Sequence, residues 1–341
     1  MIGLIYFIVA LGIIILVHEL GHLIVAKRND VYCHEFSIGM GPRIKKLGTD
    51  KSGTEYSIRA IPLGGYVMMA GEEDGKSNDA GVSEEKMLSN KSAWVKIKVL
   101  VAGSVMNIIL AIFLMMLVGF FGGTTVNTSQ VNVIDNSPMQ SAGIKSGDYI
   151  KSINQNTVEQ FDDIIKYLSE SDKSAEIVFL TEDEKTESVK QVVANEDGKY
   201  GVTPYTKKTQ LIGSIKYGFT GTYQLFKQIL ETLRLLLTQE YGVNDLAGFV
   251  GIYSMGSEVI KNGFASAIAW IAYLSVNIGI FNLLPIPALD GGRLVFAFYK
   301  LIFRRRANKK FENAVTYAGL FFMIGLFIFV TYNDIIRIIF K

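Results

Sequence analysis

The sequence contains a single cysteine, Cys33, so no disulfide can form within the chain and cysteine pairing cannot indicate its redox compartment. Net charge is also low. The 34 Lys and Arg residues nearly balance the 32 Asp and Glu residues, which argues against a nucleic-acid partner. The first apolar stretch lacks a basic leader and ends in Lys27 and Arg28 rather than in a small-residue cleavage site. We therefore expect this stretch to be retained as a membrane helix.

Apolar residues make up 49% of the chain and are gathered into blocks. Four blocks have the length of about 20 residues that a helix needs to cross ~30 Å of hydrocarbon. They are residues 2–26, 99–122, 264–284 and 314–332. A fifth stretch, residues 211–237, carries four charged residues and is typical of an amphipathic helix on or near the membrane. Residues 245–263 predict a helix packed against the bundle or partly entering it. The pattern predicts a polytopic α-helical membrane protein with about four transmembrane helices.

The orientation follows from the basic residues close to the spans. Seven Lys or Arg residues and no acidic residue lie between Arg293 and Lys310, so we expect this short loop to be cytoplasmic. Both chain ends and the long middle segment are then extracytoplasmic, and residues 27–98 are cytoplasmic. The middle segment agrees with this orientation, because residues 159–197 hold twelve acidic and four basic residues.

The segments between the blocks have strand character. Residues 31–72 predict short strands and hairpins, and residues 73–93 predict a flexible polar loop. Residues 124–206 predict a small α/β domain in which a strand, a short helix, a strand, an amphipathic helix and two strands follow one another. We therefore divide the chain into an N-terminal membrane part (1–123), this small domain (124–206) and a C-terminal membrane part (207–341).

Two histidines and a glutamate lie inside the first apolar block, as His18-Glu19-Leu20-Gly21-His22. Residues four apart share one face of a helix, so both imidazoles can reach one metal ion. Glu19 lies beside them, where it can deprotonate a metal-bound water. Zinc prefers nitrogen ligands and needs a third protein ligand and an open position for water. Because polar side chains in hydrocarbon are costly unless they are paired, we interpret these residues as a metal site within the membrane, towards its cytoplasmic side.

Asp290 is the candidate third ligand. It follows Pro285 and Pro287, which stop a regular helix, and it precedes Gly291 and Gly292, which allow a close backbone approach. A carboxylate at the cytoplasmic end of the third span would lie at the depth of the two histidines. A helix cap or turn is the alternative role, but the histidine pair needs a third ligand and therefore favours the metal site.

Other polar residues near the spans have two interpretations. Asn277 and Asn282 in the third span serve either function or interhelical hydrogen bonding. Asn107 in the second span is interpreted as a packing residue. His34 and Cys33 are chemically able to bind zinc, but they follow the first helix in a strand-like stretch, and we interpret both as bystanders.

With these motifs, the chain resembles the site-2 protease family of intramembrane zinc metalloproteases, of the bacterial RseP/RasP type with a single PDZ domain. The resemblance depends on HELGH at 18–22 and NLLPIPALDGG at 282–292, with support from RAIPLGGYVMMAGE at 59–72 and AGSVMNIILA at 102–111. It implies that His18, His22 and Asp290 bind Zn²⁺ and that Glu19 is the catalytic base.

The resemblance also implies residues that bind the substrate. Asn282 and Asn277 would orient the unwound substrate strand. Gly64, Gly65 and Tyr66 match the family's membrane-associated β-hairpin on the cytoplasmic side, which receives the substrate as an added strand.

The implied substrates are single-span membrane proteins such as membrane anti-sigma factors or remnant signal peptides, cut after an upstream site-1-type protease. The implied location is the bacterial cytoplasmic membrane, with the lipid bilayer around the spans and the PDZ-like domain extracytoplasmic. The sequence departs from the family at Ser104, where proline is usual, and at Phe249, and we interpret both departures as structural. Two alternatives stay open: a PDZ-bearing membrane scaffold with a non-catalytic metal site, and a cation or proton transporter that uses His18 and Asp290.

Overall fold

The computed structural model describes residues 2–72, 79–125, 127–182, 186–207, 210–238, 248–261, 263–305 and 308–339. The chain forms two compact units. The first unit is Met1–Val118 together with Lys216–Lys341, and the second is Gly119–Ile215. The segment 124–206, which we predict to be a separate domain, lies within the second unit.

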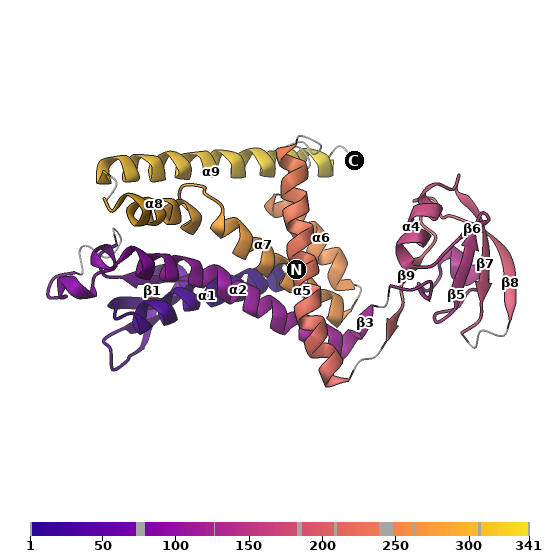
Figure 1. The fold of residues 1–341 in the computed structure, drawn as a ribbon, viewed down its shortest axis with the longest axis horizontal. Helices are drawn as coiled ribbons and strands as arrows, with labels where there is room; N and C mark the ends of the chain where they lie inside the picture. Colours follow the sequence, from indigo (N-terminus) through magenta and orange to yellow (C-terminus); the bar gives the residue numbers. More distant parts are fainter. Residues whose placement is uncertain are drawn as a thin grey trace. The chain divides into compact units, whose positions relative to one another are not determined.

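Helices make up most of the first unit (Figure 1). They are α1 (Ile2–Arg28), α2 (Ala93–Gly122), α5 (Leu211–Leu237), α6 (Phe249–Lys261), α7 (Phe264–Leu283), α8 (Asp290–Phe303) and α9 (Lys309–Ile339). Four of them are long and apolar enough to cross a membrane, over Gly3–Arg28, Ala93–Gly122, Phe264–Leu283 and Lys310–Arg337. The prediction of four apolar spans is confirmed, and the chain is a multi-pass membrane protein.

The basic stretch between the third and fourth spans contains a helix, α8, where the sequence predicted only a short loop. Leu294 and Ala297 of α8 are buried and pack against Ile97 and Leu100 of α2. This apolar face explains the helix, because residues three and four apart share one side. The helix ends at Phe303, and the C-cap residue Arg304 has a left-handed backbone (φ 55°).

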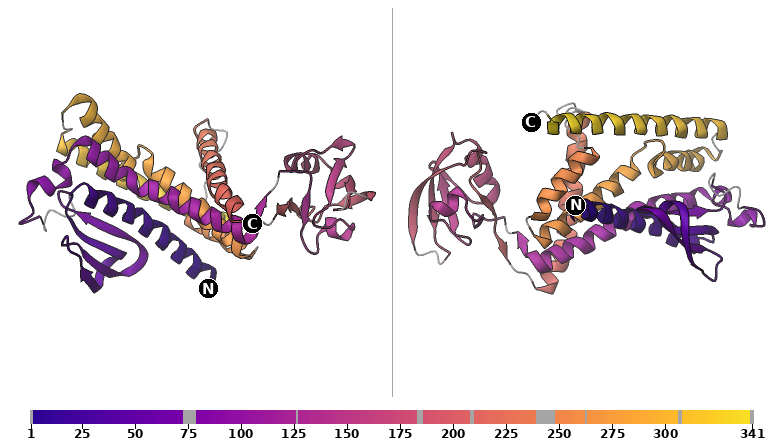
Figure 2. Two further views of the ribbon diagram at one scale, coloured as in Figure 1. Left: turned by 60° about the horizontal axis from the view of Figure 1, so that its bottom comes forward. Right: turned by 180° about the vertical axis from the view of Figure 1, so that it is seen from behind.

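One long antiparallel hairpin replaces the short strands predicted for residues 31–72. It is formed by β1 (Cys33–Thr49) and β2 (Glu55–Met69). Strand β2 lies along α1 (Figure 2), and glycines on both elements permit the close approach. A Cβ at Gly12 would lie 3.3 Å from the carbonyl oxygen of Pro62, and one at Gly65 would lie 3.2 Å from Leu16 Cδ1. The hairpin thus follows the helix that carries the two histidines.

The predicted polar loop at 73–93 is partly ordered into helical turns. Residues 73–78 lie outside the described residues, and the rest contains the 3₁₀ turns η2 (Glu84–Lys86) and η3 (Leu88–Asn90). Leu88 is buried against the hairpin and α1, which anchors this part of the segment.

The second unit contains small antiparallel sheets around its own apolar core. The elements are β3 (Thr124–Thr125), β4 (Val131–Val133), α3 (Pro138–Ser141), β5 (Tyr149–Ile153), β6 (Asn156–Thr157), α4 (Phe161–Ser169), β7 (Ser174–Leu180), β8 (Glu187–Val193), β9 (Val202–Pro204) and β10 (Thr206–Lys207). The sheets have the strand orders β6-β5-β7-β8, β4-β9 and β10-β3. Met139, Ile144, Ile150 and Ile177 are fully buried in the core, and each such side chain contributes about 1.5–3 kcal/mol.

Candidate metal centre

Two helices bring three potential ligand atoms together. His18 and His22 lie one turn apart on α1, and Asp290 is the first residue of α8. Asp290 Oδ2 lies 3.0 Å from His18 Nε2 and 3.2 Å from His22 Nε2, and the two Nε2 atoms are 3.1 Å apart. Among the described residues, this is the one group of three or more His, Cys, Asp or Glu side chains whose ligand atoms lie within 4.8 Å of one another.

These distances fit zinc. Tetrahedral zinc bonds of about 2.0–2.1 Å place neighbouring ligand atoms about 3.3 Å apart, close to the three separations at this site. Three protein ligands also leave a fourth position open, as in catalytic zinc sites. In addition, His22 Nδ1 donates a hydrogen bond of 2.7 Å to the carbonyl oxygen of Val99, which leaves the Nε2 lone pair for the metal.

Helix α2 approaches the histidines through glycine. A Cβ at Gly103 would lie 2.6 Å from Nε2 of His18 and 2.6 Å from Nε2 of His22. A Cβ at Gly21 of α1 would lie 2.7 Å from Cγ of Met106 on α2. Both distances are well below an ordinary van der Waals contact. Glycine at position 103 therefore keeps the space beside the two nitrogen atoms open.

The turn between α7 and α8 places Asp290. Pro285 and Pro287 cannot continue α7, which ends at Leu283. Ala288 then adopts a left-handed backbone (φ 75°), and α8 begins two residues later. A Cβ at Gly291 would lie 2.6 Å from the carbonyl oxygen of Leu283, so glycine is needed for α8 to start against this turn. The chain therefore folds back sharply and directs Asp290 towards α1.

Glu19 contacts the hairpin. Its Oε2 accepts a hydrogen bond of 3.2 Å from the backbone N–H of Val67 in β2. Its Oε1 forms no hydrogen bond within the described part of the chain. One carboxylate oxygen is thus held by the strand, and the other remains available for a proton.

The residues predicted to bind substrate lie in two places. Gly64, Gly65 and Tyr66 lie on β2 beside α1, and the Tyr66 hydroxyl accepts a hydrogen bond of 2.7 Å from Arg59. Asn282 lies in the last turn of α7, and its amide forms no hydrogen bond with the described residues. Asn277 donates to the carbonyl oxygen of Tyr273 in its own helix at 3.0 Å. Their part in substrate binding stays a prediction.

Other polar residues near α1 have partners other than His18, His22 and Asp290 (the ligand triad), with one exception. His34 Nε2 lies 2.9 Å from Asp79 Oδ1. Burial raises the pKa of the Cys33 thiol to about 12, so this group stays protonated and is a poor metal ligand at neutral pH. The exception is Asn107 of α2, interpreted from the sequence as a packing residue, whose Nδ2 lies 3.4 Å from Nδ1 of His18.

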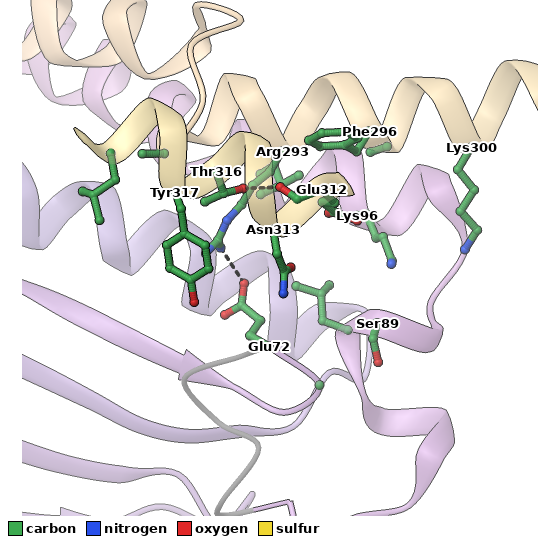
Figure 3. Close-up of a pocket in the computed structure, with 16 residues that line it drawn as sticks. Glu72, Ser89, Lys96, Arg293, Phe296, Lys300, Glu312, Asn313, Thr316 and Tyr317 are labelled. Atoms are coloured by element: carbon green, nitrogen blue, oxygen red, sulfur yellow. Dashed lines mark hydrogen bonds and ion pairs between the residues drawn. The ribbon is translucent and has the colours of Figure 1, made fainter. Parts of the chain in front are cut away.

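A cavity of about 530 Å³ adjoins α8 (Figure 3). It is lined by the end of the hairpin, the start of α2, one face of α8 and the first turns of α9. Charges of both signs meet there, and Arg293 Nη1 lies 2.8 Å from Glu72 Oε1. His18, His22 and Asp290 are not among its lining residues, so the cavity is a neighbour of the triad and not its pocket.

This multi-pass membrane protein has three potential metal ligands, and a carboxylate lies beside the two histidine ligands on their helix. These are the features of a membrane-embedded zinc peptidase. The family model described as peptidase family M50 matches residues 6–326. The chain is 32% identical over 415 aligned positions to the Regulator of sigma-W protease RasP of Bacillus subtilis, covering 97% of this chain and 98% of that protein. It is 36% identical over 338 positions to a Clostridium perfringens protein named "Putative zinc metalloprotease", with 98% of each chain covered. The chain belongs to peptidase family M50, the site-2 protease family of intramembrane zinc metalloproteases, and the recognition made from its motifs is confirmed.

The alignment with RasP has 74 more positions than the whole chain has residues. RasP therefore carries insertions relative to this protein, with a total length close to that of a small domain. The Clostridium perfringens relative aligns over 338 positions and needs no such insertion.

Proposed function

We propose that this protein is an endopeptidase that cleaves single-span membrane proteins within or near their transmembrane helix. His18, His22 and Asp290 are its zinc ligands, and Glu19 is its catalytic base. The observation that carries the proposal is the convergence of three ligand atoms within 3.2 Å of one another, beside a carboxylate with one oxygen already fixed.

The chemistry divides between the metal and Glu19. When bound, zinc supplies a Lewis acid that lowers the pKa of a coordinated water to about 7 and polarises a carbonyl. Glu19 Oε1 takes the proton from the attacking water and passes it to the leaving amine nitrogen. The hydrogen bond from Val67 to Oε2 holds the carboxylate in one orientation during both transfers.

Substrate binding uses the strand beside α1. We infer that an unwound substrate segment adds to β2 near Gly64, Gly65 and Tyr66 through main-chain hydrogen bonds. The Asn282 amide, which has no partner among the described residues, then binds the same segment, and Asn277 lies on the same helix one turn and a residue earlier. Because the substrate helix must open, spans with weak helix formers are cut faster than spans of leucine.

We infer the substrate class from the relatives and the predicted topology. One relative is named a regulator of sigma-W, which supports membrane anti-sigma factors as substrates, and remnant signal peptides are the other class. We place the protein in the bacterial cytoplasmic membrane, with both termini outside and the zinc site towards the cytoplasm. Residues 124–206 form an extracytoplasmic PDZ-like domain between the membrane parts 1–123 and 207–341. That domain acts as a filter which admits substrates already trimmed by an upstream site-1-type protease.

Glu19→Gln tests the proposal, because the amide keeps the size of the side chain and the bond to Val67 but cannot take a proton. We expect the purified variant to bind one zinc as tightly as wild type and to lose cleavage of a reconstituted single-span substrate. Glu231→Gln is the matched control. Glu231 is an exposed residue of α5 that pairs with Arg234, so its loss leaves zinc binding and cleavage unchanged.

Two outcomes contradict the proposal. Cleavage that persists in Glu19→Gln shows that Glu19 is not the base. A metal or proton flux in liposomes without any cleavage favours the transporter alternative. The absence of both flux and cleavage favours the scaffold. Proteomics of membranes from cells with wild type or Glu19→Gln then identifies the substrates as single-span fragments that accumulate in the variant.

A further inference from the structure

One face of α2 contacts both histidines of the metal site. Val99, Gly103 and Asn107 lie four residues apart, so they share this face. Val99 accepts the hydrogen bond from His22 Nδ1, and Gly103 lies beside the two Nε2 atoms. The Asn107 amide lies beside Nδ1 of His18, at 3.4 Å. Each histidine thus has its Nδ1 next to a polar group of the same helix.

Asn107 is enclosed by three helices. Its side chain is fully buried, and its backbone carbonyl accepts a hydrogen bond of 2.8 Å from Ser275 of α7. A Cβ at Gly279 of α7 would lie 3.3 Å from Asn107 Cβ. Tight packing on this side limits the movement of the side chain, so its amide has a defined position against His18.

The amide oxygen of Asn107 is buried and has no hydrogen-bond partner among the described residues. A buried, unpaired carbonyl oxygen is rare, because it loses its bonds to water without replacement. This oxygen and the nitrogen that faces His18 exchange places when the carboxamide turns by half a rotation.

The chemistry of a zinc-bound histidine decides which amide atom faces the ring. Nε2 is the atom of His18 that lies near Asp290 and His22, so the proton of the neutral ring is on Nδ1. A protonated Nδ1 needs an acceptor, and an amide nitrogen is only a donor. The oxygen of Asn107 is the acceptor available at this position.

We propose that Asn107 is a positioning residue of the zinc site, whose Oδ1 accepts the Nδ1–H of His18 and holds Nε2 towards the metal. The inference depends on the proposed role of His18 as a zinc ligand. Val99 does the same for His22 through a backbone carbonyl, which no substitution can remove. Asn107 is therefore the member of this pair that mutagenesis can test.

The test is the zinc affinity of the purified, detergent-solubilised protein, measured by competition with a chelator. We expect Asn107→Ala to weaken zinc binding by about 10- to 100-fold, the usual effect of losing such a partner. Asn107→Asp keeps an acceptor at the same place, so its affinity stays within about threefold of wild type or rises. Cobalt substitution adds a spectroscopic signature, since we expect the d–d absorption of the cobalt-loaded protein to change in Asn107→Ala and to be retained in Asn107→Asp.

Thr222→Val is the matched control. It removes a buried hydroxyl that has no hydrogen-bond partner among the residues the structure describes, from another helix of the same unit, and replaces it with a group of the same shape. Zinc affinity should not change. Equal affinity of Asn107→Ala and wild type overturns the inference, and so does an Asn107→Asp variant that loses as much affinity as Asn107→Ala. If Asn107→Ala does not fold, Asn107→Asp decides alone: retained affinity supports the inference, and a tenfold loss overturns it.

Failure of the inference and failure of the proposed function give different results. If wild type binds no zinc, or if His18→Ala binds it as tightly as wild type, the proposed ligands are wrong. If His18→Ala loses zinc while both Asn107 variants bind it normally, the ligands stand and Asn107 only packs.

Discussion

Gly103→Ala should empty the metal site without unfolding the helices. The added methyl group would lie 2.6 Å from the Nε2 atoms of His18 and His22, which are the two nitrogen ligands of the proposed centre. It would also lie 2.6 Å from Cε1 of His18. The substitution thus acts on the ligand atoms and not on the surface of the protein.

The size of the effect follows from the distances. Unbonded heavy atoms pack at about 3.5–4.0 Å, so the rings or α2 must move by roughly 1 Å. Zinc sites tolerate errors of only about 0.2 Å in ligand distance. Both histidines cannot then bind one ion at normal bond lengths, and we expect zinc affinity to fall by more than about 100-fold, the upper end for loss of an outer-shell partner.

The assay is chelator competition on purified protein, with circular dichroism to check helix content. Gly325→Ala is the control, because Gly325 lies in α9 and a Cβ there would meet nothing within 4 Å. This control should bind zinc normally, and its free energy of unfolding should rise by up to about 1 kcal/mol because alanine has a better helix propensity than glycine. A Gly103→Ala protein that binds zinc within threefold of wild type would refute the reasoning.

Two further predictions concern the hairpin. Gly64→Ala places a Cβ 2.9 Å from the Cβ of Ile15, at a residue whose φ is 78°. We expect the free energy of unfolding to fall by about 1–2 kcal/mol and cleavage to slow, while zinc affinity stays normal. Thermal unfolding and cleavage assays measure both, and Gly48→Ala, with open space around it, should change neither. Burial raises the pKa of Glu35, but hydrogen bonds from Arg59, Ser57 and Tyr66, together with the positive charge of Arg59, outweigh burial and hold the pKa below its ordinary value of 4.5. The folded state therefore keeps the carboxylate charged at a lower pH than the unfolded state does, so this stabilisation is complete above about pH 4.5 and is lost as the pH falls further. Thermal unfolding between pH 7 and pH 3.5 should show that Glu35→Gln lacks this acid-dependent loss, and equal pH dependence of the two proteins would contradict the assignment.

The sequence is sufficient to predict the spans, because a run of about 20 apolar residues has few other uses. It also identifies His18, His22 and Asp290 as partners, since each is costly near hydrocarbon without a reason to be there. The structure brings the three side chains together, although their roles await the experiments above. The longer elements of the second unit follow the predicted order, because alternation and turn residues are local signals, whereas the short strands β3, β6, β9 and β10 were not predicted.

The features that the sequence did not predict depend on contacts between segments distant in the chain. The sequence did not predict α8 because the seven Lys and Arg residues from Arg293 to Lys310 indicated a loop, while the apolar face of α8 is visible only once α2 is placed against it. The single long hairpin arises because α1 supports β2 along its length, which residues 31–72 alone cannot indicate. Asn107 lies 89 positions from His18 in the sequence, so its contact follows only from the packing of two helices. The one sequence signal for this contact is the carboxamide of Asn107 in an otherwise apolar stretch.

The bond from Val67 to Glu19 has a consequence for the evolution of this enzyme. The strand proposed to take up the substrate also supplies the donor that orients the general base. A change along β2 that favours a new substrate therefore alters the alignment of the base as well. Selectivity and turnover cannot be optimised independently at this strand, and variants with a new preference should also show a changed rate constant.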